Sequence, residues 1–161
     1  MSGVQSKLKY CIDTCAIVDA GERYYPIDVF PTFWDNLDRL AQSGRLKAPN
    51  MLVRELERKT EIWRDWVYSR SETLLIPPDR EFFSHLTDVV QVYESYNNGQ
   101  FDMEKIGGDP FFIALAKQHQ LTLITVESNR QGGFRIPNIC REVGVKTVTL
   151  LGLNRSEGWT F

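Results

Sequence analysis

The segment Leu121-Thr122-Leu123-Ile124-Thr125-Val126 is followed by Glu127 and is the clearest strand in the chain. Its β-branched residues favour extended backbone, and an apolar run of this kind is typical of a strand buried on both faces. A shorter apolar run, Leu8 to Ile12, also stops at a carboxylate, Asp13. If the two strands run parallel in one sheet, Asp13 and Glu127 lie at the same edge of that sheet, where ligands of such folds bind.

Helical patterns alternate with strand patterns along the rest of the chain. Further strands are expected at 73–76 and 145–151, and helices at 29–43, 51–69, 80–96, 110–119 and 137–143. Asp79 is expected to open one of these helices, and Gly44 and Gly144 to end two others. The alternation predicts an α/β fold with a central, mainly parallel sheet covered by helices on both faces.

Length and composition favour one globular domain. The chain has 161 residues, and its 42% hydrophobic and 25% charged residues exclude the disordered and coiled-coil classes. We expect a single domain over 1–161, with a short tail at 1–7 and a C-terminal extension at 152–161. No apolar run is long enough to cross a bilayer, and the N-terminus lacks the apolar core of a secretory signal, so we expect a cytoplasmic protein without membrane contacts.

Cysteine usage and charge narrow the classes of function further. Three cysteines without a CxxC pair, together with two histidines, supply a zinc site poorly, so reduced thiols are expected. The net charge of −2 argues against nucleic-acid binding through overall positive charge. Residues 45–70 and 128–146 nevertheless carry a basic excess, whereas acids concentrate at 11–44 and 72–110. The pattern allows an acidic centre flanked by basic arms.

Two more carboxylates have both a structural and a functional interpretation. Asp109 precedes Pro110 and an apolar helix, so it reads as an N-cap, and one of its oxygens would stay available to a metal. Glu55 falls at the margin of the apolar face of a continuous helix, where a carboxylate must be paired, protonated or metal-bound. A salt bridge with Arg58 or Lys59 explains it equally well, and a helix that frays after residue 60 would change the face. The apolar face comprises Leu52, Leu56, Ile62, Trp63, Trp66 and Val67.

The four acids together carry a stronger implication than each alone. Asp13, Glu55, Asp109 and Glu127 in one cleft would repel one another unless a divalent cation were bound. Oxygen-only ligation selects Mg²⁺ or Mn²⁺. Such ions activate water and stabilise a leaving alkoxide, which is what the hydrolysis of a phosphodiester requires.

The same residues resemble the PIN domains, a family of metal-dependent ribonucleases that includes many bacterial and archaeal toxins. The resemblance runs from Tyr10 to Leu151 and rests on four spaced motifs. These are Ile12-Asp13-Thr14-Cys15-Ala16-Ile17-Val18-Asp19, Leu52-Val53-Arg54-Glu55-Leu56, Asp109 with Phe112-Ile113-Ala114-Leu115-Ala116, and Leu123-Ile124-Thr125-Val126-Glu127. The fourth acid is usually Asp in the family and is Glu127 here. The stretch 24–33 and the ending 157–161 look like a divergent subgroup of unassigned function.

The resemblance implies a single-domain PIN-like fold and a metal-dependent endoribonuclease. Asp13 and Asp109 would be the principal ligands of Mg²⁺ or Mn²⁺, with Glu55 and Glu127 completing the cluster, some of them through water. Thr125 would orient the fourth acid or a bound water. The resemblance also implies an RNA substrate, an antitoxin partner and a homodimer. The residues that we expect to hold the RNA backbone are Arg54, Arg58 and Arg130.

Two other functional classes remain open at the level of the sequence. A PIN-like module that binds RNA or protein without catalysis would keep the acids without productive chemistry, and Glu127 in place of Asp keeps this alternative alive. A phosphatase with a nucleophilic aspartate is disfavoured, because Cys15 stands where such enzymes have the second acid of a DxD pair. The aromatic face of Phe30, Phe33, Trp34 and Leu37 would serve either a homodimer or the core.

Overall fold

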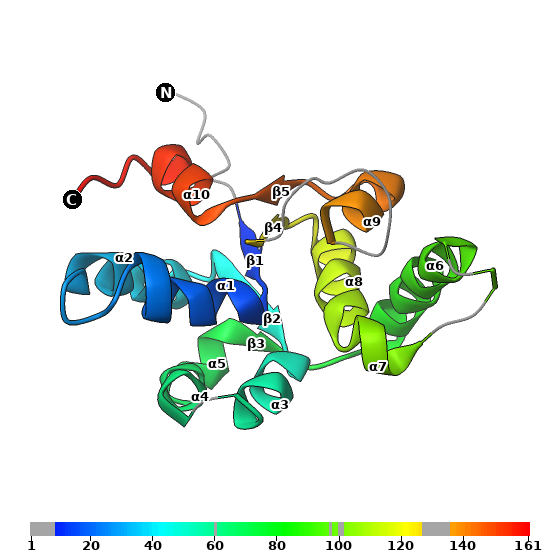
Figure 1. Cartoon of the computed structure of the whole chain (residues 1–161), viewed down its shortest axis with the longest axis horizontal. Helices are drawn as coiled ribbons and strands as arrows, with labels where there is room; N and C mark the ends of the chain where they lie inside the picture. The colour runs from blue at the N-terminus through cyan, green and yellow to red at the C-terminus, as the bar shows by residue number, and fades with distance from the viewer. Residues whose placement is uncertain (1–8, 60, 97, 100–101, 127–135) are drawn as a thin grey trace.

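A five-stranded parallel sheet forms the centre of the protein, as expected from the sequence (Figure 1). The computed structural model describes residues 9–59, 61–96, 98–99, 102–126 and 136–161. The strands are β1 (Tyr10–Ile12), β2 (Leu46–Pro49), β3 (Leu75–Ile76), β4 (Thr122–Ile124) and β5 (Thr147–Val148). Their order is β3-β2-β1-β4-β5, so β1 lies in the middle, with Tyr10 paired with Leu46 on one side and Thr122 on the other.

Helices cover both faces of the sheet (Figure 1). On one side lie α1 (Thr14–Asp19), the π-helix η1 (Ala20–Tyr24), α2 (Pro31–Gln42), α5 (Ser71–Leu74) and α10 (Leu150–Glu157). On the other lie α6 (Arg80–Tyr96), α7 (Met103–Ile106), α8 (Asp109–His119) and α9 (Ile136–Val143). Two short helices, α3 (Met51–Glu57) and α4 (Glu61–Tyr68), follow the carboxyl end of β2. The α/β fold class predicted from the sequence is therefore confirmed.

The core lies where α8 packs on the central strands. All three residues of β1 are fully buried, as expected for a parallel strand covered on both faces. Five consecutive residues of α8, from Phe112 to Ala116, are buried between the sheet and α6. The ring of Trp34 in α2 stacks on Trp63 in α4 at 4.7 Å between centroids. Of the two interpretations of the aromatic face in α2, the core one therefore holds for Phe33, Trp34 and Leu37, which are all buried.

Several predicted boundaries are confirmed by their local chemistry. Helix α6 spans 80–96 as expected, and the carboxylate of Asp79 accepts a hydrogen bond of 2.8 Å from the Phe82 N–H. Gly44 and Gly144 have φ angles of +76° and +78°, the left-handed conformation that ends a helix. Helix α8 begins at Asp109, with Gly108 at the N-cap position, so Asp109 stands one residue further into the helix than predicted.

The predicted helix over 51–69 is wrong as one unit. The chain forms α3 and α4 instead, and the side chain of Ile62 is 68% exposed rather than on the apolar face. The predicted strands at 73–76 and 145–151 are shorter than expected, because 73–74 belong to α5 and 150–151 to α10. Strand β2 and helix α1 were not predicted.

Helix α10 is attached to the start of the sheet by a largely buried ion pair. The Glu157 carboxylate accepts hydrogen bonds of 2.8 and 2.7 Å from the two terminal nitrogens of Arg45, and one of 2.7 Å from the Tyr10 hydroxyl. The side chains of Arg45 and Glu157 are only 16% and 11% exposed. Burial and the Glu157 carboxylate raise the pKa of Tyr10 well above its usual range, so its hydroxyl stays neutral and donates.

No helix in the described ranges is long and apolar enough to cross a membrane.

Candidate functional site at the carboxyl edge of the sheet

Asp13 lies at the carboxyl end of the central strand. Its backbone N–H donates to the Ile124 carbonyl of β4 at 3.1 Å, which continues the pairing of β1 and β4 by one residue. The side chain is 1% exposed, and one carboxylate oxygen accepts a hydrogen bond of 3.2 Å from the Thr125 hydroxyl. The neighbouring ends of two parallel strands thus supply a carboxylate and the hydroxyl that orients it.

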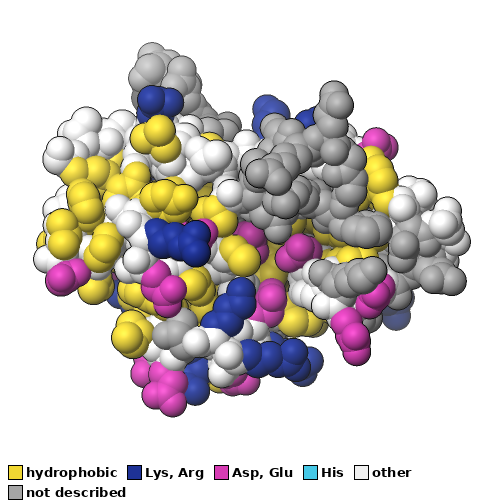
Figure 2. Space-filling model, in the orientation of Figure 1, with side chains coloured by type: hydrophobic (Ala, Val, Ile, Leu, Met, Phe, Trp, Pro, Cys, Tyr) yellow, Lys and Arg dark blue, Asp and Glu magenta, His cyan; other side chains and the backbone are white. Residues whose placement is uncertain are grey.

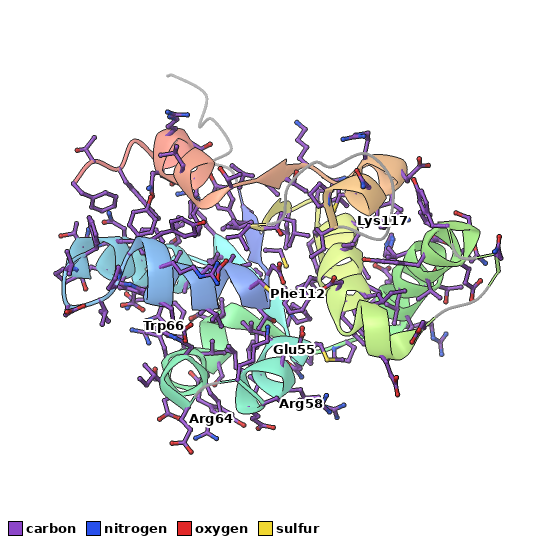
Figure 3. The ribbon with its side chains drawn as sticks, viewed as in Figure 1. Glu55, Arg58, Arg64, Trp66, Phe112 and Lys117 are labelled. Atoms are coloured by element: carbon purple, nitrogen blue, oxygen red, sulfur yellow. The ribbon has the colours of Figure 1, made fainter. Side chains whose placement is uncertain are left out.

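Glu55 projects from α3 toward the same edge and toward α8 (Figure 3). Its carboxylate accepts a hydrogen bond of 3.1 Å from the hydroxyl of Thr14, the residue after Asp13. Burial raises the pKa of Glu55 above its usual value, although the Thr14 hydrogen bond and the charges of Lys59 and Arg58 act in the opposite direction. Arg58 and Lys59 thus act on this carboxylate through their charge, but among the described residues neither forms an ion pair with it, and desolvation outweighs their effect on its pKa.

Gly108 allows α3 and α8 to come together beside Asp109. A Cβ atom at position 108 would lie 2.7 Å from a carboxylate oxygen of Glu55 and 2.6 Å from Cγ of Met51. Real Cβ atoms do not approach other atoms so closely, so a side chain at 108 would displace Glu55. Asp109 follows directly as the first residue of α8. The structure thus brings the elements that carry Asp13, Glu55 and Asp109 to one edge of the sheet.

Acidic side chains gather near the centre of the face where α1, α3 and α8 meet, with basic side chains around them (Figure 2). Arg54 is exposed on α3, and Arg58, the residue directly after this helix, is exposed and points outward from the site (Figure 3). Glu127 and Arg130 lie outside the described residues. Within the described part of the chain, no three His, Cys, Asp or Glu side chains form a group that could hold a metal ion.

Sequence reasoning did not identify the roles of Thr14 and Gly108 at this edge. Both depend on contacts between segments far apart in the chain, since Thr14 bonds to Glu55 and Gly108 faces α3. Thr125 is predicted to orient the fourth acid or a bound water; Glu127 lies outside the described residues, and the bond that the structure shows for the Thr125 hydroxyl is to Asp13. The sequence signal available for Gly108 was its position directly before the acid-bearing helix.

We expect Glu55→Gln to raise the free energy of unfolding near neutral pH in the presence of EDTA. Because burial raises the pKa of Glu55 in the folded state, the folded protein binds this proton more tightly than the unfolded chain does. Ionised Glu55 therefore lowers stability above its raised pKa, and this cost disappears as the pH falls through both values. Glutamine carries no charge and keeps an oxygen to which Thr14 can donate.

Thermal unfolding at about pH 7, well above the ordinary pKa of a glutamate, and at about pH 4, just below it, measures this effect. The gain in Tm of Glu55→Gln over the wild type should be larger at the higher pH. Glu57→Gln changes an exposed carboxylate two residues along the same helix and should alter the Tm little at either pH. A variant at position 55 that is less stable than the wild type at about pH 7 would contradict the desolvation argument.

Solved structures of VapBC and FitAB proteins bound to DNA have a similar fold. VapBC2 from Rickettsia felis, bound to a DNA fragment from its promoter, matches with a TM-score of 0.55 and 13% identity, over 88% of this chain and 98% of that one. DNA-bound VapBC from Salmonella typhimurium matches with a TM-score of 0.54 and 14% identity, over 88% and 98%. FitAB bound to an IR36 DNA fragment matches with a TM-score of 0.50 and 15% identity, over 87% and 94%. These likenesses confirm the PIN-like fold expected from the sequence.

No curated protein matches the chain by sequence. A family model, however, does match it. A family model described as a domain of unknown function, DUF4411, matches residues 10–161, which include every described element from β1 to α10. The chain is therefore a member of the DUF4411 family, with a PIN-like fold.

Proposed function

We propose that the protein is a metal-dependent endoribonuclease that acts as the toxin of a toxin–antitoxin pair. The observation that carries the proposal is Asp13, which is 1% exposed at the carboxyl end of the central strand, the sheet edge toward which the elements that carry Glu55 and Asp109 also lead. Ligands of open parallel sheets bind at this edge. The likeness of the fold to VapBC and FitAB complexes supports both the toxin assignment and an antitoxin partner.

The donor set at this edge fits Mg²⁺ or Mn²⁺. Asp13, Glu55, Asp109 and Glu127 offer oxygen ligands only, which these ions prefer. Burial disfavours the charged form of Glu55, and a divalent cation would relieve that cost. Mg²⁺ keeps several of its waters and needs only one or two direct carboxylates, so carboxylates that do not converge tightly still suit it.

Different residues of the chain would bind the metal ion, orient its ligands and bind the RNA phosphates during hydrolysis of the phosphodiester. Bound Mg²⁺ or Mn²⁺ would supply an activated water and stabilise the leaving oxygen. Asp13 and Asp109 would be the principal ligands, and Glu55 and Glu127 would complete the set, some of them through water. Thr125 holds the Asp13 carboxylate through its hydroxyl. Phosphates of the RNA would lie on the basic side chains of Arg54, Arg58 and Arg130.

A second candidate function is a PIN-like module that binds RNA or protein without cutting. One observation favours it: the described residues contain no group of three side chains that could hold a metal ion. Cleavage of single-stranded RNA by the purified protein, with Mn²⁺ and with EDTA, separates the two functions. Cleavage that requires Mn²⁺ supports the nuclease, whereas binding of RNA without cleavage at any metal concentration supports the binding module.

We expect divalent metal to raise the thermal stability of the protein. An ion that binds only the folded state stabilises it by about 2.7 kcal/mol when its concentration is 100 times its Kd. The Tm of the wild type should therefore rise with millimolar Mn²⁺ or Mg²⁺ and return to its original value with EDTA. An unchanged Tm would contradict a metal site in the folded protein, and an equal rise for a variant lacking the Asp13 carboxylate would place the ion elsewhere.

A further inference from the structure

A pocket of about 290 Å³ lies next to the carboxylate edge, at the carboxyl ends of β2 and β3. It is bounded by these two strand ends, the first turn of α3 and the first turns of α6 and α8. The lining residues that matter for its chemistry are Asn50, Met51, Arg54, Phe82, Phe83 and Phe111. Because all strands are parallel, the pocket opens at the same edge of the sheet as Asp13.

One wall of the pocket is aromatic. Phe82 is 2% exposed, and its ring centroid lies 5.5 Å from that of Phe83 and 6.0 Å from that of Phe111. Phe83, in contrast, is 52% exposed at the rim. Single exposed apolar side chains are common on protein surfaces, but this ring borders a cavity, so its exposed part is open to a ligand that enters there. A planar π-face is the partner that such rings prefer.

The polar groups of the pocket suit an anionic ligand with hydrogen-bonding edges. Arg54 is exposed and contributes a fixed positive charge, and no carboxylate occurs among the described residues that line the cavity. The side-chain amide of Asn50 offers both donors and an acceptor. Aromatic faces, an arginine and an amide are the groups with which proteins hold the unstacked bases of single-stranded RNA.

The size and position of the pocket select a single base rather than a peptide helix. Its volume is close to the lower end, about 300 Å³, of pockets that hold small molecules, whereas an amphipathic helix needs a groove for side chains over two or more turns. Met51 lines the pocket, and both its Cγ and the Glu55 carboxylate lie within 2.7 Å of the Cβ position on Gly108. A base that touches Met51 in the pocket would therefore lie close to the Glu55 carboxylate.

We propose that this pocket binds one nucleobase of single-stranded RNA, adjacent to the phosphodiester bond held at the carboxylate edge. The base lies against Phe83 and Phe111, its edge meets Asn50, and its phosphate lies near Arg54. The adjacency to a scissile bond rests on the proposed ribonuclease function. The binding of the base itself does not.

Methyl NMR of the full-length protein tests this proposal. The chain has three methionines, so selective labelling gives a short spectrum in which Met51→Leu identifies the Met51 signal. The probes are AMP, GMP, CMP and UMP in EDTA, with ribose 5-phosphate as the probe that lacks a base. We expect at least one nucleotide to shift the Met51 methyl signal through the ring current of its base, in a saturable manner, while ribose 5-phosphate does not.

Variants at the exposed rim give matched controls. Phe83→Ala should weaken nucleotide binding by about 5- to 140-fold, the range for loss of one stacking ring. Phe83→Tyr keeps the π-face and should bind like the wild type. Ile62→Ala removes an apolar side chain that is 68% exposed outside the pocket and should change nothing.

Four results would overturn the base pocket. Equal shifts with ribose 5-phosphate would indicate a phosphate site, and a response to N-acetylphenylalaninamide but to no nucleotide would indicate a peptide site. A Met51 shift on dilution of the free protein would indicate a contact with a second copy of the chain. No response to any probe would indicate that the cavity binds none of these ligands. The test is separate from catalysis: cleavage without a Met51 response rejects the base pocket alone, and a Met51 response without cleavage rejects the nuclease alone.

Discussion

Replacing Asp13 by asparagine is expected to abolish metal-dependent cleavage of RNA while the protein stays folded. Asparagine has the same shape and keeps one oxygen that can accept from the Thr125 hydroxyl, so the local hydrogen bond survives. It loses the negative charge that a divalent cation requires. A neutral side chain at this buried position also avoids the cost of burying a charge, so stability without metal should be unchanged or slightly higher.

The expected loss of cleavage rate in Asp13→Asn can be compared with that of a variant at Thr125, whose hydroxyl donates to Asp13. Groups that orient a metal ligand typically contribute 10- to 100-fold to metal affinity or activity, and a direct ligand contributes more. We therefore expect Thr125→Val to lose roughly 10- to 100-fold, and Asp13→Asn to exceed that loss. Initial rates with Mn²⁺, with circular dichroism to check folding, measure both. Substantial cleavage by a folded Asp13→Asn protein would show that this carboxylate does not hold the ion.

Replacing Glu157 by alanine is expected to lower the free energy of unfolding by about 3 kcal/mol. Loss of one member of a buried ion pair costs about 3–5 kcal/mol, because its partner stays buried without compensation. Glu157 accepts from both Arg45 and Tyr10, and the slight exposure of the pair places the expected cost at the lower end of that range. Urea unfolding should show a lower midpoint with an unchanged m-value.

The control for this experiment is a surface ion pair in the same protein. Lys117 and Asp88 are 3.0 Å apart, but the Asp88 side chain is 55% exposed. Exposed pairs contribute about 0–1 kcal/mol, so Asp88→Ala should cost far less than Glu157→Ala. Similar losses for the two variants would mean that burial does not distinguish the two pairs.

The sequence was sufficient for the fold class because its strongest signals are local. Residues 121–126 can be assigned to a strand from their own β-branched and apolar residues. Helix α6 has both a capping aspartate and apolar residues at helical spacing. Strand β2 was missed because Leu46-Lys47-Ala48-Pro49 has no β-branched residue and ends in proline. Its extended form depends on pairing with β1 and β3, which are remote in the sequence.

The acidic residues of the candidate site could be predicted from the sequence, but the residues that contact and position them could not. Parallel strands made the location of Asp13 predictable, since the carboxyl ends of such strands share one edge. The position of Glu55 was inferred from a helical wheel that extended too far, because nothing local signals that α3 ends at Glu57. The environment of Glu55 instead depends on Thr14 and Gly108, through packing that no single segment encodes.

Helix α3 contributes residues both to the carboxylate edge and to the neighbouring cavity. Its seven residues place Glu55 at the carboxylate edge and line the neighbouring cavity with Met51 and Arg54. A helix of this length is not stable by itself, so its position is set by β2, α1 and α4. Exchange of this helix between members of the family would therefore be expected to transfer substrate preference together with the second acid, while the sheet remains a constant scaffold.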